Sequence, residues 1–231
     1  MTPPKSPRRP RNPRPPRSRR SQRPLGAALT ALPLAGVLLA GLATPASAMP
    51  PGIPDPQQAR TELDQLAVAP EGSMDGYDRT RFPHWDAGPG NCNTRESVLK
   101  RDGQDVRTGS DCYPTSGTWV SAYDGGRWTK ASQLDIDHVV PLAAAWRSGA
   151  ARWTQQQREA FANDLSSPQL LAVTDSVNQD KGDQTPDRWM PPKADFACTY
   201  ASMWVASKHK WQLTVTGPEK EALATALGTC R

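Results

Sequence analysis

The chain has 231 residues, with 28 Lys and Arg against 23 Asp and Glu, and a formal net charge of +5. Residues 1–48 carry nine of the basic residues and no acidic ones, so the remaining 183 residues have a net charge of −4. This excludes a protein that binds nucleic acid through general positive charge. Any phosphate-binding surface must be local, with a bound metal supplying much of the positive charge.

Residues 1–48 have the three parts of a secretory signal peptide. Residues 1–24 are a run rich in Arg and Pro, residues 25–42 are apolar, and Ala46-Ser47-Ala48 has the small-x-small form of a cleavage site. The alternative is a membrane anchor, since an apolar stretch of about 18 residues approaches the length of a bilayer span. Pro33 and the cleavage motif favour export. We therefore expect a secreted, extracellular protein without stable membrane association after cleavage.

Residues 49–75 are predicted to be a Pro-rich linker with a short helix near 57–66, and residues 76–231 to form a single domain. In chain order, the patterns predict strands at 118–123 and 127–129 joined by an Asp-Gly-Gly turn, an extended segment at 134–138, helices at 141–146 and 155–161, an extended segment at 169–173 and a short helix capped by Asp175. This mixture predicts an α+β domain.

The end of the chain predicts two helices and the pairing of the cysteines. A helix is expected at 194–211, and Thr216 with Glu219 forms a capping box for a last helix that ends near 228. A short turn makes these helices antiparallel, which brings Cys198 close to Cys230. Elimination then pairs Cys92 with Cys112. An even number of cysteines in an exported domain favours disulfides, and the rival, a zinc site, lacks Cys-x-x-Cys spacing.

Two polar sets carry the chemistry. Asp137 and His138 lie where an apolar segment ends, and Asn178 and Lys181 have the i,i+3 spacing that shares one face of a helix. Together they supply a carboxylate, a base, an amide oxygen and a cation, as metal-assisted phosphodiester hydrolysis requires. Adjacent strand residues point to opposite faces, so both reach one site only if the strand ends there. Asp135 is the rival metal ligand.

The motif Asp137-His138-Val139-Val140-Pro141-Leu142 followed by Asn178-x-x-Lys181 resembles HNH nucleases of the ββα-metal group. A longer match, over residues 77–230, is to secreted bacterial HNH nucleases related to the C-terminal domain of GmrSD-type restriction enzymes. The other segments that carry this resemblance are 92–99, 135–138, 161–164, 170–173, 178–183 and 189–192. The resemblance implies a ββα-metal core with flanking helices, stabilised here by two disulfides.

Roles for individual residues follow from this resemblance. His138 matches the general base, Asp137 and Asn178 match the ligands of one Mg²⁺ or Mn²⁺, and Gln169 matches the residue that braces the ββ loop. Lys181 is the second polar group of the last motif and a candidate for holding the phosphate. For Lys181 the alternative is a solvated helix position.

Arg95 is a second candidate for the phosphate, and its alternative is an ordinary first turn of a helix. His84 and His209 have no partner motif, so they are expected to be structural or at the surface. The expected substrate is DNA, with RNA as the alternative, and the expected state is a monomer. Two other classes stay open: an exported non-catalytic binding module on the same fold, and a metal hydrolase acting on another substrate.

Overall fold

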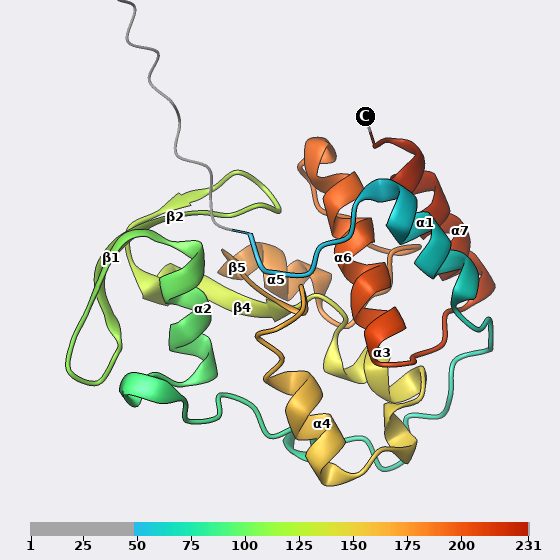
Figure 1. Cartoon of the computed structure of the whole chain (residues 1–231), viewed down its shortest axis with the longest axis horizontal. Coiled ribbons are helices and arrows are strands. Elements are labelled where there is room, and N and C mark those ends of the chain that lie inside the picture. The colour runs from blue at the N-terminus through green and yellow to red at the C-terminus, as the bar shows by residue number, and fades with distance from the viewer. Residues whose placement is uncertain (1–48, 231) are drawn as a thin grey trace, which may run out of the picture. The chain divides into compact units, whose positions relative to one another are not determined.

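The computed structural model describes residues 49–230, so the predicted signal peptide lies outside the described residues. The described part is a mixed α+β unit (Figure 1). Its α-helices are α1 (Pro56–Gln65), α2 (Thr94–Asp102), α3 (Leu142–Arg147), α4 (Gln155–Ala162), α5 (Asp175–Lys181), α6 (Ala197–Lys210) and α7 (Gly217–Gly228). Its strands are β1 (Gln104–Thr108), β2 (Pro114–Val120), β3 (Arg127–Trp128), β4 (Leu134–His138) and β5 (Leu170–Thr174). Short 3₁₀ helices lie at η1 (Arg79–Arg81), η2 (Pro89–Asn91), η3 (Ala131–Gln133), η4 (Ala150–Arg152) and η5 (Ala194–Phe196).

The strands form two small antiparallel sheets. One has the order β1-β2-β3, and the other pairs β4 with β5 from Leu134↔Thr174 to His138↔Leu170. Strand β1 was not predicted from the sequence. Its residues read Gln-Asp-Val-Arg-Thr and none is fully buried, so it lacks the apolar alternation that identifies a strand.

The pair β4–β5 lies between two hydrophobic clusters. All five residues of β5 are buried, which explains its continuous apolar sequence. The smaller cluster joins this pair to α2 and β2 and consists of Val98, Leu99, Trp119, Ala131, Leu134, Ile136, Leu170 and Ala172. The larger cluster takes up Leu171 and Val173 together with residues of α1, α3, α4, α6 and α7. Burial on both sides fixes the register of β4 and therefore the positions of its polar residues.

Helix α2 also covers the outer edge of β5. The Asp102 carboxylate accepts a hydrogen bond of 2.8 Å from the Ala172 N–H, and Arg101 donates one of 2.6 Å to the Leu170 carbonyl. These two side chains occupy backbone groups that a neighbouring strand would otherwise bind. The edge is thereby closed to pairing with another chain.

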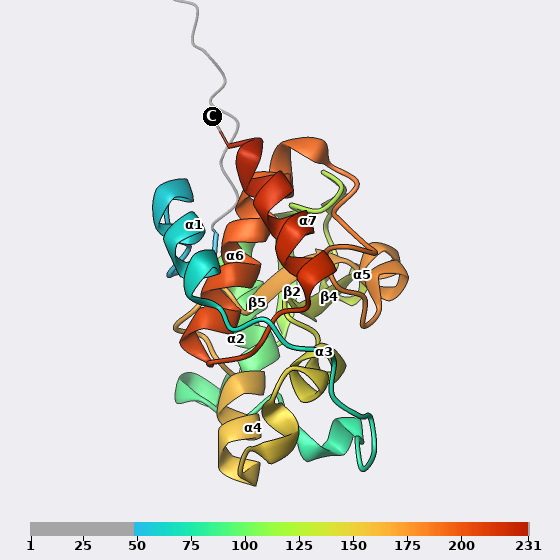
Figure 2. The ribbon, with the colours of Figure 1, turned by 90° about the vertical axis from the view of Figure 1, so that its right-hand side faces the viewer.

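The predicted linker is partly wrong. The short helix within it is confirmed as α1, but this helix packs against α6 and α7 with Ala59 and Leu63 buried (Figures 1 and 2). Beyond it, the Ala69 N–H donates to the Val215 carbonyl at 2.9 Å. The apolar face of α1 is stabilised by burial against these helices, which a solvated tether would leave exposed.

The prediction for the end of the chain is confirmed. Thr216 and Glu219 form the capping box of α7, and α6 and α7 pack together. Cys198 in the first turn of α6 is bonded to Cys230 just past α7, with 5.3 Å between the Cα atoms. Within the described residues no helix is long and apolar enough to cross a membrane.

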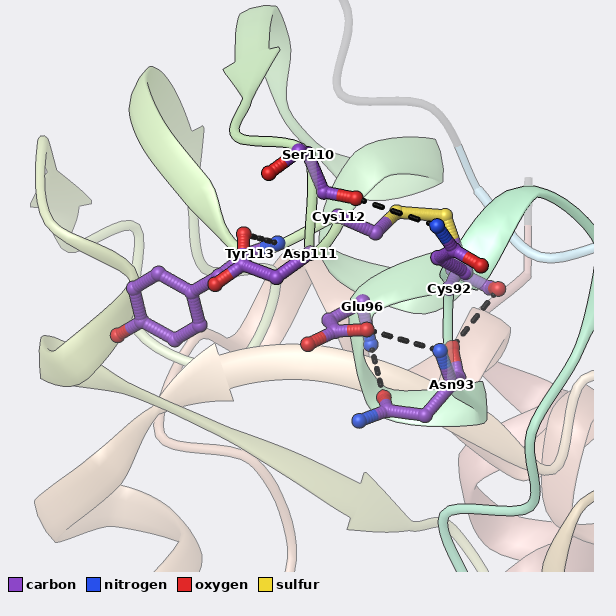
Figure 3. The surroundings of a disulfide bond; sticks show 9 residues. Cys92, Asn93, Glu96, Ser110, Asp111, Cys112 and Tyr113 are labelled. Atoms are coloured by element: carbon purple, nitrogen blue, oxygen red, sulfur yellow. Dashed lines mark hydrogen bonds between the residues drawn. A yellow bond between two sulfur atoms is a disulfide. The ribbon is translucent and has the colours of Figure 1, made fainter.

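The second disulfide, Cys92–Cys112, is also confirmed, with a Cα–Cα distance of 4.9 Å. It ties the start of α2 to the connection between β1 and β2. Beside it, Asn93 and Glu96 form a reciprocal capping box at the start of α2 (Figure 3). The bridge and the cap together fix the end of the helix that covers β5.

Candidate active site

A cavity of about 190 Å³ opens where β4 ends. The residues that line it come from β4, the start of α3, the end of α5 and the segment around η1: Tyr77, Arg79, Ile136, Asp137, His138, Pro141, Leu142, Ala143, Asn178, Gly182 and Asp183. Asp137 and His138 both reach it because the strand ends at His138. The structure thus brings together three of the predicted site residues, Asp137, His138 and Asn178.

Helix α5 follows β5 directly and lies against β4. Asn178 donates to Asp135 at 3.1 Å, and Lys181 donates to Asp137 at 2.8 Å. Asn178 and Lys181 are three residues apart on one face of α5, and Asp135 and Asp137 are two residues apart on one face of β4. The two faces therefore meet and form both hydrogen bonds. Asp175 does not cap this helix as predicted. It is the first helical residue, and the N-cap is Thr174, which makes no side-chain cap bond.

Asp137 is a buried carboxylate with two donors. Its Oδ1 accepts from Lys181 and its Oδ2 accepts from the Tyr123 hydroxyl. Lys181 has no exposed side-chain surface, and its Nζ also donates to the His138 carbonyl at 3.0 Å. Burial raises the pKa of Asp137, while the charge and hydrogen bond of Lys181 oppose this rise. Lys181 therefore holds both Asp137 and His138 in place. The alternative, that Lys181 is a solvated helix residue, is wrong.

One hydrogen bond fixes the tautomer of the neutral His138 ring. Its Nε2 lies 2.9 Å from the Ala162 carbonyl oxygen, which can only accept. The proton of the neutral ring is therefore on Nε2, and Nδ1 is the nitrogen left to accept a proton. Burial lowers the pKa of His138 to about 3, so the imidazole is neutral at physiological pH.

A loop with His84 and Trp85 packs on the His138 ring. The indole of Trp85 stacks on the imidazole with 5.7 Å between ring centroids, and His84 meets it edge-on at 6.0 Å. His84 is thus a neighbour of the site, which its sequence context did not indicate. Trp85 has φ +69°, a left-handed conformation that is costly for a bulky side chain. Surrounding contacts must therefore hold the loop in place.

Asn163 provides those contacts. Its Nδ2 donates to the Pro83 carbonyl at 3.0 Å, and its Oδ1 accepts from the Asp86 N–H at 3.0 Å. One side chain thus binds the loop on both sides of His84 and Trp85. The preceding residue, Ala162, supplies the carbonyl that orients His138. The end of α4 therefore positions the candidate base from two directions.

Asn178 is oriented by Asp135. Because its amide nitrogen donates to that carboxylate, the amide oxygen is left for another partner, and Asn178 lines the cavity. Asp135 itself does not line the cavity. Asp135, the alternative metal ligand, therefore lies behind Asn178 and supports its orientation.

Gln169 forms hydrogen bonds to the backbone that follows β4, and its bracing role stays a prediction. It is fully buried, its Oε1 accepts from the Val140 N–H at 3.2 Å, and its Nε2 donates to the Val140 carbonyl at 2.8 Å. The Gln169 carbonyl also accepts from Val139 at 2.8 Å. These bonds hold the backbone that leaves β4 and so fix the end of the strand at the cavity.

The structure does not place Arg95 or Lys181 to hold a phosphate. Arg95 donates to the carbonyls of Ala131 and Leu134, at the other end of β4 from the cavity. Lys181 is buried behind Asp137. A different cation, Arg79, lines the cavity. Arg79 belongs to no recognisable motif and is far from the others in sequence, so nothing in the pattern singled it out.

Comparison with known proteins assigns the chain to a family. A family model described as the C-terminal domain of GmrSD restriction endonucleases matches residues 95–226, more than half of the chain. The chain belongs to this family. A relative from Arthroderma benhamiae, an uncharacterized secreted protein, is 56% identical over 190 residues, which are 82% of this chain and 93% of the relative. No solved structure matches the chain.

Membership of the GmrSD C-terminal family confirms the nuclease-related part of the resemblance. The relative is fungal, so the expected bacterial origin stays a prediction. The family match includes Asp137, His138, Asn178 and Lys181 but begins after Arg79. The protein is secreted, as its relative is, and its two disulfides agree with that location.

Proposed function

We propose that the protein is a secreted, metal-dependent endonuclease of the HNH type that hydrolyses phosphodiester bonds of DNA. The observation that carries the proposal is the meeting of Asp137, His138 and Asn178 at one cavity, on two antiparallel strands followed by a helix. This order of two strands and a helix supports the ββα core that the resemblance implies. Membership of a nuclease-related family supports it.

The donors at the cavity fit a hard divalent cation. The Asp137 carboxylate offers about four lone-pair positions, and Lys181 and Tyr123 use one on each oxygen. The Asn178 amide oxygen is turned away from Asp135. Residues 49–230 contain no group of three or more His, Cys, Asp or Glu that could hold a metal. We propose that this ion is Mg²⁺ or Mn²⁺. It would be held by Asp137 and Asn178 and would keep several water ligands, as Mg²⁺ usually does in proteins.

In the proposed reaction His138 is the general base. Its Nδ1 takes a proton from a water molecule, whose oxygen attacks phosphorus as the bond from phosphorus to the 3′-oxygen breaks. The hydrogen bond to Ala162 keeps the other ring nitrogen protonated, so Nδ1 is free for this role. Lys181 and Tyr123 hold the Asp137 carboxylate in place. A divalent cation held by Asp137 and Asn178 would stabilise the negative charge that develops during the reaction.

Plasmid degradation tests the proposal. The exported protein should cut supercoiled DNA in Mg²⁺ or Mn²⁺, lose activity in EDTA and regain it when the ion is added back. His138→Ala should lose roughly 10²–10⁴-fold in rate. The matched control is His209→Ala, because His209 bonds Gln65 and is not part of the cavity. Cutting that survives chelation or His138→Ala would contradict the proposal, and parallel assays on RNA would show which substrate is preferred.

A further inference from the structure

Arg79 is the cavity residue whose charge the proposed reaction does not use. Four of the lining side chains are charged or basic: Arg79, Asp137, His138 and Asp183. Asp137 is paired with Lys181, and Asp183 is paired at 2.6 Å with Arg147, which also binds Glu71 at 3.1 Å. His138 is neutral. Within residues 49–230 Arg79 has no ion-pair partner, although it is exposed and lines the cavity.

The carboxylate next to Arg79 in sequence is engaged elsewhere. Asp78 accepts from the backbone N–H of Thr80 at 2.8 Å and from its hydroxyl at 2.6 Å. These hydrogen bonds lower the pKa of Asp78, with a further contribution from the charge of Arg81. In the described part of the chain, residues 49–230, Arg79 therefore lines the cavity without an ion pair to Asp78 or to another carboxylate.

The backbone that carries Arg79 is fixed on both sides. On one side Tyr77 packs against Trp146, with 5.8 Å between ring centroids. On the other side Phe82 is fully buried, and Arg158 donates to the Arg81 carbonyl at 3.0 Å. A side chain on so well anchored a turn loses less freedom on binding than one on a mobile loop, so it suits recognition.

Arg79 shares the cavity with both motif residues of β4. The cavity has a volume of about 190 Å³, and Arg79, Asp137 and His138 all line it. The arginine and the proposed base and metal ligand thus act on the same small volume. An anion in the cavity would lie within reach of all three.

We propose that Arg79 binds a phosphate group of the nucleic-acid substrate, in the role that the sequence suggested for Arg95 or Lys181. The inference rests on the proposed nuclease function and names its substrate-binding cation. A guanidinium donates in a planar fork that matches two phosphate oxygens, which an ammonium does not. The net negative charge of the domain repels an anionic substrate. Arg79 would offset this repulsion locally, because it places one unpaired positive charge at the proposed cleavage site.

The matched pair Arg79→Gln and Arg81→Gln tests this proposal. Both variants remove one positive charge from the same 3₁₀ turn, but Arg81 lies over the Trp146 ring, 5.8 Å from its centroid, and does not line the cavity. In the His138→Ala background, binding of a fluorescein-labelled duplex oligonucleotide is measured by anisotropy, in EDTA and in Mg²⁺. Arg79→Gln should weaken binding roughly 10- to 100-fold, the loss of a charge-assisted hydrogen bond.

Salt dependence gives a second measurement. The slope of log affinity against log salt should fall by about 0.9 for Arg79→Gln, as expected for one lost phosphate contact, and stay unchanged for Arg81→Gln. In the active protein Arg79→Gln should raise KM, and Arg79→Lys should recover part of the loss because it keeps the charge without the fork. Equal affinities and slopes for the two Gln variants would overturn the inference. Absence of His138-dependent cutting in the wild type would instead overturn the proposed function, and the binding measurements would still decide the role of Arg79.

Discussion

Lys181 and Asp137 form an ion pair of 2.8 Å in which the lysine side chain is fully buried and the carboxylate is 5% exposed. The pair joins α5 to β4 directly behind the cavity. A buried pair gains little net stability over apolar residues, but removing one partner leaves the other charge without compensation. The pair therefore links the stability of the domain to the geometry of the site.

Lys181→Met should destabilise the domain by about 3–5 kcal/mol, because the Asp137 carboxylate would remain buried without its cation. Urea unfolding at pH 7 measures the change. The double variant Lys181→Met with Asp137→Asn should be less destabilised than Lys181→Met alone, since it removes both charges. Unchanged stability in the single variant would contradict the buried pair.

Acid should destabilise the protein partly through His138. Its pKa is about 3 in the folded state and near 6.5 when unfolded, so the unfolded chain takes up the proton first as the pH falls. The stability contributed by the neutral ring is complete above pH 6.5 and is lost between pH 6.5 and about 3. The raised pKa of Asp137 acts in the opposite direction.

The measurement compares wild type with His138→Gln, which keeps a donor for the Ala162 carbonyl but does not titrate. Between pH 6.5 and pH 5 the wild type should lose roughly 1.5 kcal/mol more than the variant in urea unfolding. Asp137 is present in both proteins, so the difference isolates the histidine. Parallel curves for the two proteins would show that His138 is not buried as the structure has it.

Much of the site could be predicted because its central elements carry local signals. The alternation of apolar and acidic residues in β4 and the apolar run of β5 mark strands, and the spacing of Asn178 and Lys181 places both on one face of a short helix. The motif residues Asp137 and His138 stand at the end of β4. A reader of the sequence therefore obtains the two strands, the helix and the polar positions from patterns within about ten residues.

The supporting contacts were not predictable in the same way. Tyr123 binds Asp137, Asn163 binds the loop that carries Trp85, and Arg79 lines the cavity, yet each belongs to a different segment. Nothing in their local sequence indicates these partners, because the contacts depend on the packing of the two hydrophobic clusters. Arg95 failed as a candidate for the same reason: its helix was identifiable but its direction relative to β4 was not.

Asn163→Ala should lower both stability and activity. It removes the hydrogen bonds to Pro83 and Asp86 that hold the loop against His138, together with those to Thr94 and Glu159. Net hydrogen bonds contribute about 1 kcal/mol each, so a loss of roughly 4 kcal/mol in urea unfolding is expected. The rate should fall through kcat more than through KM, since the loop positions the base. Trp85→Phe, which keeps an aromatic ring on the imidazole, should retain more activity than Trp85→Ala; equal rates would exclude a positioning role for the stacked ring.

Asn178→Ala and Asp135→Ala should both raise the Mg²⁺ concentration required for half-maximal cutting. Asn178→Ala removes the proposed ligand, whereas Asp135→Ala removes the group that turns the Asn178 amide oxygen toward the cavity. Loss of such a supporting contact costs about 10- to 100-fold in metal affinity, so the shift should be smaller for Asp135→Ala than for Asn178→Ala. Titration of activity with Mg²⁺ measures both, and the control is Asp180→Ala, which removes an exposed carboxylate of the same helix that does not line the cavity. If Asp135→Ala shifted the requirement more than Asn178→Ala, Asp135 would be the metal ligand and the assignment of Asn178 would be wrong.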